Sequence, residues 1–133
     1  MIVPVLSRHI DLVWPQVLRH IERWLAEEGI WSPEGIRNEL KAARAQLWCF
    51  VKDDVRGIWV TRIDKPDGKL VGLIWGCAGD FVEFKDESIE CFGAIERWMK
   101  EKGCELIEIV GRGGWARVFP DYERQAVVLR KKL

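Results

Sequence analysis

One glycine-rich turn combines residue types that could bind an anion. The run Gly111-Arg112-Gly113-Gly114 precedes a short helix-like segment, and Arg117 follows three positions later. Amides at a helix N-terminus carry partial positive charge, and glycine lets a ligand approach them closely. The alternative is a tight strand-to-helix turn with Trp115 packed inward, which is the commoner role of a lone glycine cluster.

Side chains that could transfer protons are few and scattered. Glu108 lies within an apolar, strand-like run and could act as a general base through a water molecule, although a solvated edge carboxylate is the default interpretation. His9 and His20 are isolated in the sequence. We expect His20 at the surface, beside the apolar stripe of a helix, rather than in a base role.

The cysteines do not have the spacing of a metal site. They are separated by wide, irregular gaps and include no C-x-x-C pair, and no pair of histidines lies nearby. We therefore expect no metal, and we expect the thiols to be small buried hydrophobic groups in a reducing compartment. These residues are Cys49, Cys77, Cys91 and Cys104.

The bulk composition argues for one globular domain spanning residues 1–133. The 21 Lys and Arg residues balance 21 Asp and Glu residues, so no basic excess indicates a nucleic-acid partner. The first residues do not form a signal peptide, and we see no apolar run long enough for a membrane span. We expect a protein that is neither secreted nor membrane-bound, with unknown oligomeric state.

Periodicity and turn signals predict a mixed α/β fold with about six strands. Three consecutive strands should pair antiparallel, and the later strand–helix–strand unit should be a right-handed parallel crossover, with helices on both faces of the sheet. The predicted strands are 2–6, 46–52, 57–63, 70–77, 105–110 and 124–130, and the predicted helices are 12–28, one opened by Ser32-Pro33, 87–102 and 115–119.

This order, β-α-α-β-β-β-α-β-α-β, resembles the GNAT (Gcn5-related N-acetyltransferase) superfamily over nearly the whole chain. The ending Gly111-Arg112-x-Gly114-Trp115-x-Arg117-Val118 and the stretch Ala45-Gln46-Leu47-Trp48 are similar to small GNAT-like proteins of tailed bacteriophages and prophages. Such proteins are described as acetyltransferases, and some belong with internal virion proteins. The resemblance implies a location in the host cytoplasm or the virion, with a virion or host protein as a partner.

The resemblance also implies where acetyl-CoA would bind. In the family, two central strands splay apart and the cofactor lies between them, which places Trp75, Gly76 and Cys77 at this position. The pyrophosphate rests on amides that open the following helix, where Gly79 is the matching glycine. Arg112, Gly113 and Gly114 are further candidates. Family enzymes often use a tyrosine on the last helix as a general acid. Tyr122, the single tyrosine, lies after that helix, past Pro120, and a structural role as a packing aromatic is the favoured interpretation.

The stretch before the third long helix departs from the family pattern. It lacks R-x-x-G-x-G, and the carboxylates of Asp80, Glu83, Asp86 and Glu87 are opposed within the stretch by Lys85 alone. Asp86, Glu87 and Ser88 instead suit the first turn of a helix that caps itself. This departure favours a protein without a cofactor over one that binds acetyl-CoA.

Three functions remain open from the sequence. The first is a non-catalytic, phage-type accessory or virion-associated protein that keeps the fold. The second is an active acyl-CoA N-acetyltransferase that modifies an amine of a protein or a small molecule. The third is a binding module that uses an open sheet edge or a surface formed by Trp31 and Trp59, if both are exposed.

Overall fold

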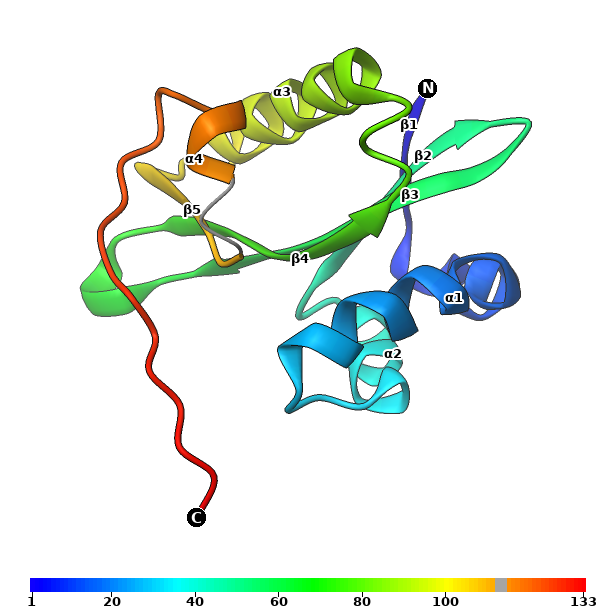
Figure 1. Cartoon of the computed structure of the whole chain (residues 1–133), viewed down its shortest axis with the longest axis horizontal. Coiled ribbons are helices and arrows are strands. Elements are labelled where there is room, and N and C mark those ends of the chain that lie inside the picture. The colour runs from blue at the N-terminus through cyan, green and yellow to red at the C-terminus, as the bar shows by residue number, and fades with distance from the viewer. Residues whose placement is uncertain (112–114) are drawn as a thin grey trace.

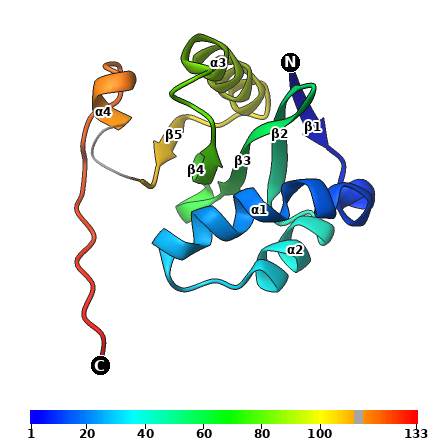
Figure 2. The same cartoon turned by 45° about the vertical axis from the view of Figure 1, so that its right-hand side comes forward.

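The computed structural model describes residues 1–111 and 115–133, and its centre is a five-stranded sheet in the order β1-β2-β3-β4-β5. Helices α1 and α2 cover one face of this sheet and α3 covers the other (Figures 1 and 2). The elements are β1 (Ile2–Val5), α1 (Ile10–Glu28), α2 (Pro33–Lys41), β2 (Gln46–Lys52), β3 (Asp54–Asp64), β4 (Val71–Gly79), α3 (Lys85–Glu101), β5 (Leu106–Ile109) and α4 (Trp115–Val118), with short 3₁₀ turns at Ser7–His9 and Pro66–Gly68.

The strand pairing is the one that the sequence predicts for the first five strands. Strands β1 to β4 pair antiparallel with their neighbours, and β4 pairs parallel with β5. Helix α3 makes the crossover between β4 and β5, because parallel neighbours cannot be joined by a tight turn. The structure therefore has the GNAT-like α/β fold with helices on both sheet faces.

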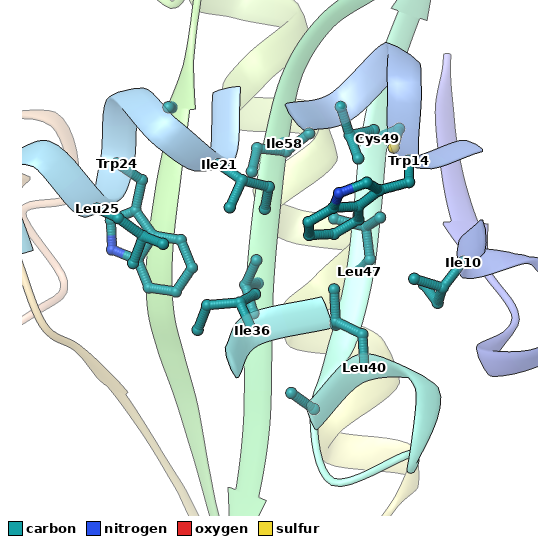
Figure 3. Close-up of a cluster of buried hydrophobic side chains, with 14 of the residues drawn as sticks. Ile10, Trp14, Ile21, Trp24, Leu25, Ile36, Leu40, Leu47, Cys49 and Ile58 are labelled. Carbon is teal, nitrogen blue, oxygen red and sulfur yellow. The ribbon is translucent and has the colours of Figure 1, made fainter. Parts of the chain in front are cut away.

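The face under α1 holds the first of two apolar cores. Trp14, Ile21 and Trp24 of α1 point onto the sheet, where Leu47 and Ile58 meet them (Figure 3). Apolar residues recur along α1 at three- and four-residue spacing, so one stripe of the helix faces the strands. Burial of each such side chain stabilises the fold by roughly 1.5–3 kcal/mol.

The opposite face, under α3, holds the second core. Phe92, Ile95 and Met99 of α3 are buried against Trp59 and Ile74 of the sheet. Trp59 is only 2% exposed, so it does not share a surface with Trp31, and the proposed patch formed by these two residues is wrong. The alternation of a central strand between its two faces explains this burial.

The predicted sixth strand at 124–130 is wrong. Residues 123–133, which we call the C-terminal tail, run as exposed backbone with no strand pairing (Figure 1). The run Ala126-Val127-Val128-Leu129 has the composition of a strand, but a strand also needs a partner edge for its ladder of hydrogen bonds. The sheet consequently has five strands instead of about six.

His20 is buried, which contradicts its expected surface position. Its side chain lies in the α1 face of the core at 3% exposure, and Nε2 is 3.0 Å from the carbonyl oxygen of Val55. Arg19 donates to the same carbonyl at 2.9 Å. Burial lowers the pKa of His20 below its ordinary value of 6.5, and the bond to Val55 opposes this only in part.

The lowered pKa of His20 predicts a loss of stability in mild acid. The folded state resists protonation of His20, so the unfolded chain binds the proton first and the contribution is lost as the pH falls below about 6.5. We expect the urea midpoint of the wild type to fall between about pH 6.5 and 5.5 by more than that of His20→Gln. For a single histidine, the free energy of unfolding changes by at most about 1.4 kcal/mol per pH unit.

The exposed His9 supplies the control for this comparison. His9→Gln should keep the pH dependence of the wild type, because it removes an exposed imidazole and leaves the buried His20 in place. An equal pH dependence in wild type and His20→Gln would show that His20 is not the group responsible.

Candidate functional site

Strands β4 and β5 part beyond Ile74. Their pairing runs from Val71↔Leu106 to Ile74↔Ile109, and the amide of Val110 donates to the Ile74 carbonyl at 3.2 Å. Residues 76–79 of β4 pair with β3 alone among the described residues. The resemblance implies that the strands splay apart here, and the described pairing of β4 with β5 does end at Ile74.

A β-bulge at Trp75 lies where the strands part. Val60 of β3 is opposite Gly76 and Thr61 is opposite Ile74, so Trp75 has no partner in the register. A bulge adds one residue to a strand and bends it, which shifts the alternation of its side chains. Trp75 and Gly76 consequently both face α1.

Trp24 of α1 fills the space at Gly76. A Cβ atom built on Gly76 would overlap the indole of Trp24, and the Trp24 and Trp75 rings meet edge to face at 5.6 Å between centroids. Gly76 is thus required by packing between α1 and β4. The sequence gives no signal for this contact, because nothing in the spacing of Trp24 and Gly76 links them.

Trp75 has further partners at the edge of the α1 face. The ring of Trp31 approaches it edge to face at 5.0 Å, and the guanidinium of Arg62 lies 4.8 Å from the Trp75 ring centroid. Trp31 is 37% exposed and follows the C-terminus of α1, where the Glu28 carboxylate accepts from its amide at 2.9 Å. Trp24, Trp31, Trp75 and Arg62 therefore form one cluster on the α1 face of β4. The sequence analysis did not identify Arg62 as a member of this cluster.

Cys77 and Gly79 also have roles within the fold. Cys77 packs in the α3 face of the core, and burial raises the pKa of its thiol to about 12, so it is no nucleophile near neutral pH. A Cβ atom on Gly79 would overlap the Gly57 backbone and lie 2.6 Å from the Arg56 carbonyl oxygen. The glycine at this position therefore allows β3 to approach β4 closely.

The loop between β4 and α3 is packed onto the sheet by aromatic side chains. Phe81 lies against Trp59 at 5.2 Å between ring centroids, and Phe84 lies against Phe50 at 5.5 Å. The Asp80 amide donates to the Arg56 carbonyl at 2.8 Å, so it is already engaged. This loop has the character of a packed connection.

The first turn of α3 differs in detail from the predicted self-capped start. The helix begins at Lys85. The N-cap residue is Phe84, whose side chain makes no capping hydrogen bond to the amides of the first turn. Ser88 is buried, and its hydroxyl donates to the Phe84 carbonyl at 2.6 Å instead of accepting from an amide. Asp86 and Glu87 do lie in the first turn, where their charge is favourable to the helix dipole.

The residues at this helix start do not fit a pyrophosphate. From Asp80 to Phe92 the chain has no glycine that would let phosphate oxygens approach the backbone. The carboxylates of Glu83, Asp86 and Glu87 are exposed at the same end of α3. Within residues 80–88 Lys85 is the one cationic residue. Outside this stretch, the Lys52 ammonium lies 5.2 Å from the Phe84 ring centroid, and Met1 and Arg97 line a pocket with Glu87.

Glu108 and Tyr122 lie on opposite faces of the sheet. In β5, Ile107 and Ile109 join the α3-face core while Glu108 is exposed, so Glu108 points to the face where Trp75 lies. Tyr122 packs 5.7 Å from Phe92 of α3. Burial, followed by the charge of Glu96, raises the pKa of Tyr122 above its usual value.

Arg112, Gly113 and Gly114 lie outside the described residues. Within the part of the chain that the structure describes, no group of three or more His, Cys, Asp or Glu side chains is placed to hold a metal ion. No helix in that part is both long and apolar enough to cross a membrane.

Several solved structures that superpose on this chain are acetyltransferases, whereas no family model and no curated protein matches the sequence. An aminoglycoside acetyltransferase from an uncultured soil metagenomic sample, in complex with sisomicin, superposes with a TM-score of 0.73 at 18% identity over 100% of this chain and 95% of that chain. An acetyltransferase of Trypanosoma brucei superposes at 0.70 with 12% identity over 100% and 99% of the two chains.

A third neighbour contains the coenzyme. An aminoglycoside N-acetyltransferase in complex with CoA superposes with a TM-score of 0.65 at 16% identity over the full length of both chains. At these identities the likeness establishes the GNAT-like fold and does not extend to activity.

The contact between Gly76 and Trp24 predicts a stability effect. Gly76→Ala should lower the free energy of unfolding by about 1–3 kcal/mol, because the added methyl group overlaps a buried ring and the core must shift. Urea denaturation followed by tryptophan fluorescence measures the change.

Gly93→Ala is the matched control. Gly93 lies inside α3, and its Cβ would meet only the end of the Arg97 side chain at 3.4 Å. Alanine is a better helix former than glycine by about 0.5–1 kcal/mol, so this variant should be neutral or more stable. A Gly76→Ala protein as stable as the wild type would contradict the described packing.

Proposed function

We propose that this chain uses the GNAT-like fold without acetyl-CoA, as an accessory or virion-associated protein of a phage or prophage. The observation that carries the proposal is the start of α3, where the family's pyrophosphate amides would lie. The loop is packed on the sheet through Phe81 and Phe84, the amide of Asp80 is bonded to Arg56, and the exposed side chains are mostly acidic. The phage assignment rests on the resemblance of the sequence motifs.

Like charges at the start of α3 would oppose the binding of a pyrophosphate. A pyrophosphate next to Glu83, Asp86 and Glu87 meets like charges that cost on the order of 1 kcal/mol each in partly screened solvent. The absent glycine cradle removes charge-assisted hydrogen bonds, which are the stronger ones in such a site. Since about 1.4 kcal/mol is a factor of ten in affinity, these losses together weaken binding by orders of magnitude.

The two described glycines of the proposed cofactor site support the same conclusion. Gly76 accommodates Trp24, and Gly79 accommodates the backbone of β3. Internal packing is sufficient to explain glycine at both positions. A partner for such a protein would be another protein, either of the virion or of the host.

A second candidate function is an acyl-CoA-dependent N-acetyltransferase. The bulged and splayed β4 favours it, together with the exposed Glu108 on the same face as Trp75. In this case Glu108 would act as general base and Tyr122 as general acid, with Trp75, Gly76, Cys77, Gly79 and the turn that contains Arg112, Gly113 and Gly114 nearest the cofactor. The acceptor would be an amine of a protein or a small molecule.

Calorimetric titration with acetyl-CoA distinguishes the two candidates. We expect no saturable binding in the micromolar range for the wild type. The triple variant Glu83→Gln, Asp86→Asn, Glu87→Gln should bind CoA about tenfold or more tightly than the wild type at low salt, because three like charges are removed from the helix start.

A charge-matched control keeps the total charge change constant. Glu22→Gln, Glu34→Gln, Asp67→Asn removes three exposed carboxylates elsewhere and should bind CoA as weakly as the wild type. Micromolar binding of acetyl-CoA to the wild type would refute the first candidate. If the wild type then releases CoA thiol in the presence of a primary amine, and Glu108→Gln does not, the second candidate is the correct one.

A further inference from the structure

The outer edge of β5 is an unprotected strand edge. Strand β5 is last in the sheet order, and no described residue pairs with its far side. The opposite edge strand, β1, contains Pro4, which cannot donate to an added strand. Strand β5 reads Leu-Ile-Glu-Ile, with neither proline nor lysine, so its backbone is a template for another strand.

An open groove follows this edge. It has a volume of about 470 Å³ and lies between α3 and β5, with Gly93, Met99, Cys104 and Ile107 among its lining residues. Leu106 of β5 also lines the groove and is 57% exposed. The groove therefore provides apolar surface beside unpaired backbone groups, the two features that an added strand requires.

The C-terminal tail has the complementary features. Val127, Val128 and Leu129 are 61%, 79% and 90% exposed, and the tail pairs with no strand. Three consecutive large apolar residues in an extended, unpaired segment are an unfavourable exposure for an isolated molecule. The segment that sequence analysis predicts as a strand is thus available for pairing.

We propose that residues 124–130 of a second copy of this chain add as a sixth strand to the edge of β5, and that the exchange is reciprocal in a two-fold symmetric dimer. In a two-fold dimer of this kind each tail occupies the partner's β5 edge, so the exchange is closed and does not propagate to further copies. The proposal concerns the assembly and is independent of the proposed function.

The path of the tail argues for a second copy over the tail's own chain. Phe119 stacks on Phe92 at 4.2 Å, and Tyr122 packs on the same ring, which fixes the start of the tail over α3. At its other end, the Arg130 guanidinium donates to the Glu28 carbonyl at 2.6 Å, at the C-terminus of α1. Between these points the tail runs apart from β5 and past the sheet (Figure 2).

Release of the C-terminal tail from Glu28 requires little free energy. The Arg130 bond to Glu28 is exposed to solvent, so water replaces it readily. One charge also favours the exchange, because Glu108 of β5 is exposed and Arg124 and Arg130 flank the apolar run of the tail. Glu105, by contrast, already pairs with Lys69 at 3.6 Å. Opposite charges on neighbouring strands stabilise a pair.

Light scattering after size exclusion, over a wide range of protein concentration, tests the dimer, and hydrogen exchange of the β5 peptide tests its location. We expect the wild type to dimerise. Val128→Pro should raise the dissociation constant by at least about tenfold, since proline removes a strand donor and its ring disturbs the ladder. Val128→Thr keeps the amide and the β-branch, and should stay within about threefold of the wild type.

Each outcome decides the proposal. Weaker dimerisation in Val128→Pro only, together with faster exchange of residues 106–110, supports it. A wild type that is monomeric at every concentration overturns it, as does a dimer that Val128→Pro leaves intact. A dimer that weakens without any change in β5 exchange overturns the assignment to this edge. Because Val128 is exposed, neither substitution disturbs the core.

Discussion

The position of β4 depends on a single irregularity, the extra residue at Trp75. Up to Ile74 the strand has a neighbour on each side, and beyond it β3 is the one strand that pairs with β4 among residues 1–111 and 115–133. The bulge turns both Trp75 and Gly76 toward α1, and Trp24 packs into the space that a glycine leaves. The register shift between β3 and β4 and the seating of α1 therefore meet at the same two residues of β4.

The protein's own groups pack tightly at the end of β4 and in the loop that follows it. Gly79 ends β4 against the backbone of β3, and the chain then continues through Phe81 and Phe84, whose rings cover the end of the sheet. The helix that follows starts with acidic side chains, which suit its dipole but oppose an anionic ligand. The same residues that stabilise this corner make it a poor phosphate site.

Local patterns in the sequence were sufficient for most of the fold. The strand at 46–52 was predicted with its observed bounds, and the turn at Lys65–Gly68 and the apolar stripe of α1 fixed the neighbouring elements. The failures involve contacts that no local pattern encodes. The segment 124–130 lacks a partner edge, and the burial of His20 depends on the Val55 carbonyl 35 residues away. The splay followed from the resemblance, whereas the bulge at Trp75 and the packing at Gly76 required coordinates.

The central claim is that the start of α3 does not bind the phosphates of coenzyme A. An amide-resolved NMR titration with CoA tests it most directly, because the resonances of residues 79–88 report on this backbone alone. We expect these resonances to stay in place as CoA is added. Saturable shifts confined to this stretch would contradict it.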